Sequence, residues 1–193
     1  MTTDAASEGA GVHVLLIDGS PTGGGRTGAA LAALGAAAAE SGAHVELLAL
    51  GDDLNGGIER AVAQLAVADA VALGSPVYRA TAAAPLKQLI DVIPRTNGEE
   101  RDSPLAGKAV AIVHTGATLH HFLASNALRD VLAGFFAAHV LPPGLYVPRE
   151  GFGDGAALLE PYADQAHRLG SALVELAVVL RDNSVLRSLR PQA

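Results

Sequence analysis

The chain has 193 residues, a length typical of one domain, and it is 50% hydrophobic but only 4% aromatic. Its net charge of -7 argues against broad nucleic-acid binding, and the lack of Cys excludes disulfides, thiolate metal sites and Cys nucleophiles. The first residues lack a basic segment followed by an apolar one, and the apolar run 172–180 is too short to span a bilayer. We therefore expect a cytoplasmic protein that binds neither membranes nor nucleic acids.

Apolar runs and helical spacing predict strands that alternate with helices. The continuous apolar runs are typical of parallel strands that are buried on both faces. In chain order the predicted elements are a strand at 12–17, a helix at 26–41, a strand at 45–50, a helix at 58–65, a strand at 70–73, a helix at 86–93, a strand at 109–113, a helix at 128–135, a strand at 139–147 interrupted at 142–144, and a helix at 162–180.

Five strand–helix repeats predict an α/β fold with a doubly wound, five-stranded parallel sheet and helices on both faces. We expect a disordered N-terminus at 1–11, one domain at 12–182 and a flexible C-terminal tail at 183–193. In an open sheet of this class, ligands bind beyond the carboxyl ends of the strands. Three predicted loops lie there, at 19–27, 75–81 and 114–118.

The first loop has the composition of a phosphate site. Its four glycines expose backbone N–H groups at a helix N-terminus, where the helix dipole also favours an anion. Ser20 and Thr27 add hydroxyl donors, and Arg26 adds a charged donor. The alternative interpretation is a plain glycine-rich turn with a solvated arginine.

The second loop suits a flat heterocycle. Pro76 stiffens the turn, so that backbone groups near it can bond the edge of a ring. Tyr78 either packs beside that ring or caps the core, and Arg79 either meets a second nucleotide's phosphate or is an ordinary exposed arginine. One ligand that touches all three loops would be about the size of a mononucleotide.

A dinucleotide-binding module is a competing interpretation. Gly23, Gly25 and Gly28 formally match its glycine pattern, although here they start too far beyond the predicted strand. Glu46 or Asp52 would then bind the ribose.

Metal and hydrolase chemistry are disfavoured. His120 and His121 are adjacent, so on a helix they point about 100° apart, and no second ligand cluster accompanies them. Ser20 and Ser75 lack the G-x-S-x-G sequence of a hydrolase nucleophile. We predict no metal site.

Several motifs carry a family resemblance. Gly19-Ser20-Pro21 and Arg26-Thr27 match a Gly-Ser-Pro-Arg…Ser-Arg-Ser/Thr loop at the same spacing. Segments 75–80 and 86–91 are similar to a Thr-Pro-Val-Tyr-Lys-Ala turn and the Leu-Lys-x-Leu-Leu-Asp helix after it, and 105–117 is similar to a Leu-x-Gly-Lys-x-Val strand with its Thr-Gly-Gly loop. Together they resemble the NAD(P)H-dependent FMN reductases of the flavodoxin-like superfamily, especially the sulfonate-utilisation type, over about 12–147.

The resemblance implies a flavodoxin-like fold, FMN as cofactor, NADPH or NADH as reductant, and hydride transfer from the nicotinamide to flavin N5. It places the FMN phosphate on Ser20, Arg26 and Thr27. It requires no acid–base side chain, so we predict no catalytic residue. The residues implied to line the flavin are Pro76, Val77, Tyr78 and Arg79 on one side and Thr115, Gly116 and Ala117 on the other.

The resemblance also implies a homodimer or homotetramer and a flavin-dependent monooxygenase that uses the reduced flavin. Thr22, Gly25 and Ala117 depart from the family pattern at flavin contacts. The helix after Thr118 is one residue shorter, near Asn126, than in members with an inserted Tyr and a transferable flavin. Two alternatives therefore stay open: a flavin-retaining NAD(P)H reductase of quinones, azo dyes or metals, and a non-catalytic FMN-binding protein.

Overall fold

The computed structural model describes residues 11–51, 53–94 and 103–191. A parallel sheet in the order β2-β1-β3-β5 forms its centre, and β6 and β7 both pair with β5 at the fifth position. This is the flavodoxin-like order and not that of the classical dinucleotide-binding fold, so the predicted fold class is confirmed. The strands are β1 (His13–Asp18), β2 (His44–Ala49), β3 (Ala70–Tyr78), β5 (Ala109–Gly116), β6 (His139–Val140) and β7 (Leu145–Pro148).

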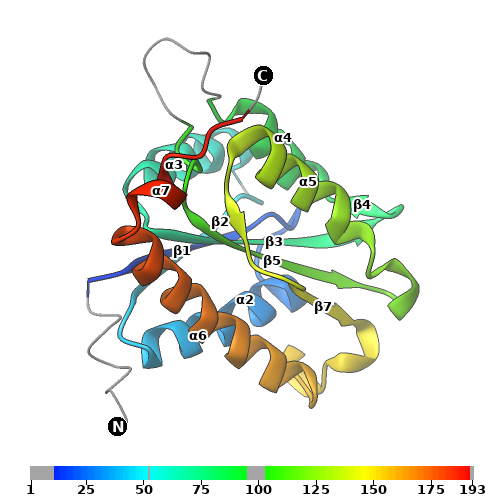
Figure 1. Ribbon diagram of the computed structural model, residues 1–193. Coiled ribbons are helices and arrows are strands. Elements are labelled where there is room, and N and C mark those ends of the chain that lie inside the picture. Colours follow the sequence, from blue (N-terminus) through cyan, green and yellow to red (C-terminus); the bar gives the residue numbers. More distant parts are fainter. Residues whose placement is uncertain (1–10, 52, 95–102, 192–193) are drawn as a thin grey trace, which may run out of the picture.

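Helices cover both faces of this sheet (Figure 1). On one face α2 (Gly25–Glu40) and α6 (Tyr162–Arg181) lie side by side, and on the other lie α3 (Leu54–Val67), α4 (Ala84–Val92) and α5 (Ala124–Phe136). Alternate residues of β1 face the helix layers on opposite sides of the sheet. Leu16 packs with α2 and α6, whereas Leu15 and Ile17 pack with the other three helices. Both faces of the strand are thus buried, as its apolar run predicted.

The α2–α6 contact depends on a glycine. A Cβ placed on Gly170 of α6 would lie 2.2 Å from the Leu34 carbonyl oxygen and 3.0 Å from the Ala37 Cβ, both on α2. Because the nearest atom is backbone, the two helices can approach this closely only where no side chain intervenes.

The third and fourth predicted strands are longer than expected. β3 and β5 stay paired as far as Pro76 and Thr115, beyond the end of β1. β3 then turns back into a short antiparallel partner, β4 (Thr81–Ala82). Most of the predicted second loop and more than half of the third are therefore strand, because cross-strand hydrogen bonds continue past the apolar runs.

The end of the chain contains one further short helix. The predicted tail 183–193 contains a short helix, α7 (Ser184–Arg187), and Leu186 packs against the core. His139 Nε2 donates to the Leu186 carbonyl oxygen at 3.0 Å. The predicted disordered segment 1–11 lies, except for Gly11, outside the described residues. None of the described helices is both long and apolar enough to cross a bilayer.

Candidate functional site

A cleft of about 520 Å³ opens at the carboxyl ends of β1, β3 and β5. Ligand pockets typically measure roughly 300–1,000 Å³, so a mononucleotide fits its size. All the predicted site residues except Arg79 line it: Ser20, Arg26, Thr27, Pro76, Val77, Tyr78, Thr115, Gly116 and Ala117. Their individual roles toward FMN stay a prediction.

The glycine loop exposes its backbone to this cleft. Gly23, Gly24 and Gly25 have φ of +64°, +62° and +59°, a region that L side chains rarely adopt. A Cβ on Gly24 or Gly25 would meet nothing within 4 Å. The first N–H groups of α2 have no acceptor within their own helix, because the i→i-4 pattern begins with Gly28 bonding to Gly24 at 3.1 Å. Bare N–H groups at a helix N-terminus fit a phosphate.

The two hydroxyls predicted as phosphate donors already have protein partners. Ser20 Oγ donates to Asp18 Oδ1 at 2.6 Å, and the backbone N–H of Ser20 donates to the same oxygen at 2.9 Å. Thr27 Oγ1 and Thr115 Oγ1 lie 2.9 Å apart and share a hydrogen bond. These bonds fix the first loop to the ends of β1 and β5.

The second segment forms one wall of the cleft. Ser75 is fully buried, and its Oγ donates to the Pro76 carbonyl oxygen and accepts from the Ala83 N–H at 2.8 Å. Its hydroxyl is therefore structural. Tyr78 is 55% exposed, whereas Arg79 sits in the β3–β4 turn with φ of +53° and does not line the cleft.

Sequence reasoning missed a residue that supports the third loop. Tyr146 Oη, on β7, donates to the Thr118 carbonyl oxygen at 2.6 Å. A Cβ on Gly116 would lie 2.0 Å from that Oη, so a side chain at this position would force the Tyr146 ring to move. Burial, then the nearby Glu150, raises the pKa of Tyr146, which keeps the hydroxyl protonated as a donor. The one sequence signal for this role was that Tyr146 lies in the predicted fifth strand, next to the strand that leads into the third loop.

The cleft is cationic although the chain is acidic overall. Arg149, in the 3-10 turn η2 (Arg149–Gly151) after β7, lines it together with Arg26. Among the described residues that line the cleft, none is Asp, Glu or His. Arg26 lies 5.9 Å from the centre of the Phe152 ring, a cation–π distance that helps to orient it. Arg149 was overlooked, although it follows the fifth strand's carboxyl end.

The remaining candidates lie elsewhere. His120 and His121 belong to η1 (Leu119–His121), and the described part of the chain contains no group of three metal-ligating side chains. Glu46, the alternative ribose ligand, lies 3.6 Å from His13 Nε2 and outside the cleft, and Asp52 is outside the described residues. His114, near the end of β5, is fully buried, its Nδ1 lies 2.9 Å from Ser125 Oγ, and burial lowers its pKa to about 4.

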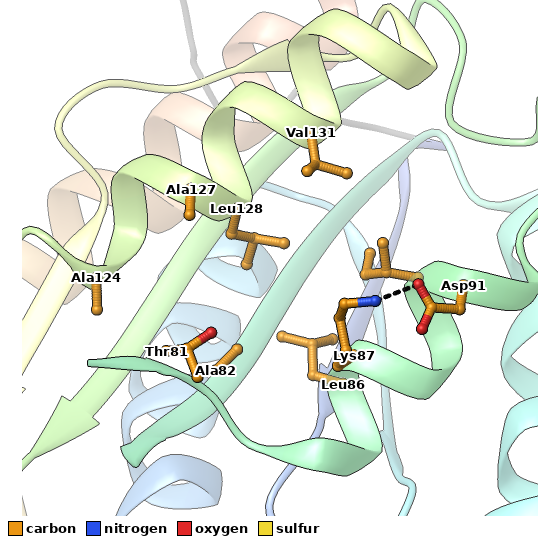
Figure 2. Close-up of a pocket in the computed structure, with 10 residues that line it drawn as sticks. Thr81, Ala82, Leu86, Lys87, Asp91, Ala124, Ala127, Leu128 and Val131 are labelled. Carbon is orange, nitrogen blue, oxygen red and sulfur yellow. Dashed lines mark hydrogen bonds and ion pairs between the residues drawn. The ribbon is translucent and has the colours of Figure 1, made fainter. Parts of the chain in front are cut away.

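A second hollow of about 180 Å³ lies between β4, α4 and α5 (Figure 2). Its walls are mainly apolar, with Leu86, Leu128 and Val131 among them. The Lys87–Asp91 ion pair of α4 lies beside it, so its charged groups already satisfy each other. Its lining offers few polar groups, whereas the first cleft gathers hydroxyl, backbone N–H and guanidinium groups, so the first cleft is the candidate site.

The sheet order defines a flavodoxin-like α/β protein, and the cationic cleft at the carboxyl edge of its sheet has the size of a mononucleotide. Residues 12–151 match the model of the NADPH-dependent FMN reductase family, and the chain belongs to that family.

Individual relatives agree with this assignment. The chain is 37% identical over 94 residues to the NADH-dependent FMN reductase SfnF of Pseudomonas putida, across 49% of this chain and 46% of that protein. It is 37% identical over 79 residues to the FMN reductase (NADPH) of Escherichia coli strain K12, across 40% and 38% respectively. The chain thus spans about half or less of these curated relatives. The apo form of the NADH:FMN oxidoreductase EMOB superposes with a TM-score of 0.70 at 23% identity, over 92% of this chain and 95% of that one, which supports the fold.

Proposed function

We propose that the protein is an oxidoreductase that uses NADPH or NADH to reduce FMN. The observation that carries the proposal is the cleft, where the glycine loop, the Pro76–Tyr78 wall and the Gly116 loop meet around Arg26 and Arg149. Membership of the FMN reductase family supports the same chemistry. When bound, FMN supplies the N5 atom that accepts a hydride from the nicotinamide.

The residues of this chain would contribute position and charge. The N–H groups at the start of α2 and the Arg26 guanidinium would hold the phosphate. Val77 and Tyr78 would flank the ring system on one side, and Gly116 and Ala117 on the other. Hydride transfer needs no protein acid or base, so alignment of the two rings is the main catalytic contribution.

The experiment follows nicotinamide absorbance with NADH and with NADPH, in the presence and absence of added FMN. Oxidation that saturates with free FMN supports the proposal. Oxidation that requires only retained FMN and an added quinone, azo dye or ferric complex favours the flavin-retaining alternative. If FMN binds and neither nucleotide is oxidised with any acceptor, the protein is a non-catalytic flavin-binding protein.

We also propose that the chain forms a homodimer or homotetramer, and that a flavin-dependent monooxygenase consumes the reduced flavin. Large side chains on α4 and α5 support self-association, since Val92 is 51% and Phe135 49% exposed. Light scattering on a sizing column should give a mass of two or four chains. A Val92→Lys variant should shift that mass toward one chain, and an unchanged assembly would exclude Val92 from the interface.

A further inference from the structure

Asp18 lies beneath the phosphate loop and takes no part in the function described so far. Its carboxyl group, at the end of β1, is 1% exposed. Oδ1 accepts both the N–H and the Oγ–H of Ser20, whereas Oδ2 is buried without a hydrogen-bond partner. A Cβ on Gly28 would lie 3.1 Å from Oδ2, so the first turn of α2 packs directly onto this oxygen. The clearance that Gly28 gives the carboxyl group accounts for the third glycine of the apparent dinucleotide pattern.

The bond between Asp18 and Ser20 limits what Ser20 can offer a phosphate. A serine hydroxyl has one hydrogen, and here that hydrogen is donated to Asp18 at 2.6 Å. A hydroxyl held in this way presents only lone pairs to the cleft, and lone pairs repel a phosphate oxygen. The phosphate must therefore compete with a carboxyl oxygen for the Ser20 proton.

Electrostatic repulsion between Asp18 and the phosphate also weakens phosphate binding. A phosphate monoester carries roughly -1.5 to -2 charge at pH 7. A phosphate oxygen in contact with Ser20 Oγ would lie within about 5 Å of Asp18 Oδ1, given the 2.6 Å between those two protein atoms. An ionised carboxyl group at that distance repels a phosphate. Arg26 and the α2 N-terminus oppose this repulsion without removing it.

We propose that Asp18 is an affinity-determining residue of this site, which withholds the Ser20 hydroxyl from the FMN phosphate and repels that phosphate, so that FMN exchanges readily. The inference rests on the proposed function, because it takes FMN as the ligand. If Asp18 acts in this way, FMN is a diffusing substrate of this protein. The effect acts on the phosphate end of the ligand and not on its ring end.

The test is a double-mutant cycle with Asp18→Asn and Ser20→Ala, read as dissociation constants from flavin fluorescence. Riboflavin, which lacks the phosphate, is the control ligand. Asp91→Asn, which removes one negative charge from the exposed end of α4, is the control variant. The amide introduced by Asp18→Asn keeps an oxygen for the Ser20 N–H, but a neutral amide oxygen holds the hydroxyl proton less strongly than a carboxylate.

Asp18→Asn should tighten FMN about tenfold and change riboflavin less than about twofold. Ser20→Ala should weaken FMN less than about twofold in the wild-type background and about fivefold in the Asp18→Asn background. If Asp18→Asn does not fold by circular dichroism, Asp18→Ala should show the same selective gain for FMN.

Weaker FMN binding in Asp18→Asn would overturn the inference, because Asp18 would then order the loop for the phosphate. An equal gain for riboflavin, or for FMN in Asp91→Asn, would also overturn it. A wild-type protein that binds neither flavin and oxidises neither nucleotide would refute the proposed function itself. The wild-type measurements alone therefore separate failure of the proposed function from failure of the inference about Asp18.

Discussion

Replacing Gly116 with Ala should displace the third loop of the cleft. The new Cβ would lie 2.0 Å from Tyr146 Oη and 3.0 Å from its Cζ, far inside van der Waals contact. The tyrosine cannot turn away without losing the 2.6 Å hydrogen bond that it donates to the Thr118 carbonyl oxygen. Gly116 is not among the residues with positive φ, so the perturbation comes from the contact and not from the backbone.

The magnitude follows from these two effects. A lost hydrogen bond of this kind destabilises by about 1 kcal/mol, and an overpacked contact by roughly 1–3 kcal/mol. For a domain of this size, we expect Tm to fall by about 5–10 °C. Because Gly116 also lines the cleft, FMN should bind about tenfold more weakly.

Thermal unfolding and FMN titration of four proteins check this prediction: wild type, Gly116→Ala, Tyr146→Phe and the double variant. Tyr146→Phe removes the oxygen in the shortest contact and should by itself destabilise by about 1 kcal/mol. The double variant should be more stable than Gly116→Ala, since most of the clash is gone. A Tm for Gly116→Ala within about 1 °C of wild type, or additive effects of the two substitutions, would refute the reasoning.

Three further predictions concern packing, pH and charge. Gly170→Ala should lower the free energy of unfolding in urea by about 3 kcal/mol, because the new Cβ meets the Leu34 carbonyl oxygen. Gly134→Ala, whose new Cβ meets nothing within 4 Å, should raise that free energy by about 0.5–1 kcal/mol. Equal effects of the two substitutions would contradict the packing argument. Burial lowers the pKa of His114 to about 4, so between about pH 6.5 and 4 only the unfolded chain binds a proton at this residue. The free energy of unfolding should therefore fall by about 2 kcal/mol from pH 7 to pH 5. The His114→Asn variant should lose that part of the pH dependence. Arg26→Ala should weaken FMN binding about tenfold and leave riboflavin binding unchanged. Arg168→Ala, which removes an exposed charge paired with Asp164 on α6, should alter neither. A loss shared by riboflavin would place Arg26 at the ring instead of the phosphate.

The sequence alone determined the fold class and the edge of the sheet at which the three loops meet. Apolar runs such as 12–17 mark strands buried on both faces, because only a sheet with helices on both sides removes every side chain of the run from water. The interrupted fifth strand at 139–147 was also predicted, and both halves pair with β5. Parallel strands bring their carboxyl ends to one edge, so the three loops had to meet there.

The tertiary structure decided what those loops contact. The length of β3 and β5 depends on hydrogen bonds between strands far apart in the chain, which no local pattern encodes. The need for glycine at 116 comes from Tyr146, far along the chain, and the state of the Ser20 hydroxyl comes from how Asp18 turns at the strand end. Arg149 joins the cleft because the fifth strand ends beside β5. Local periodicity reports which side chains leave water, whereas hydrogen-bond partners and steric limits are set by neighbours that only the folded chain brings together.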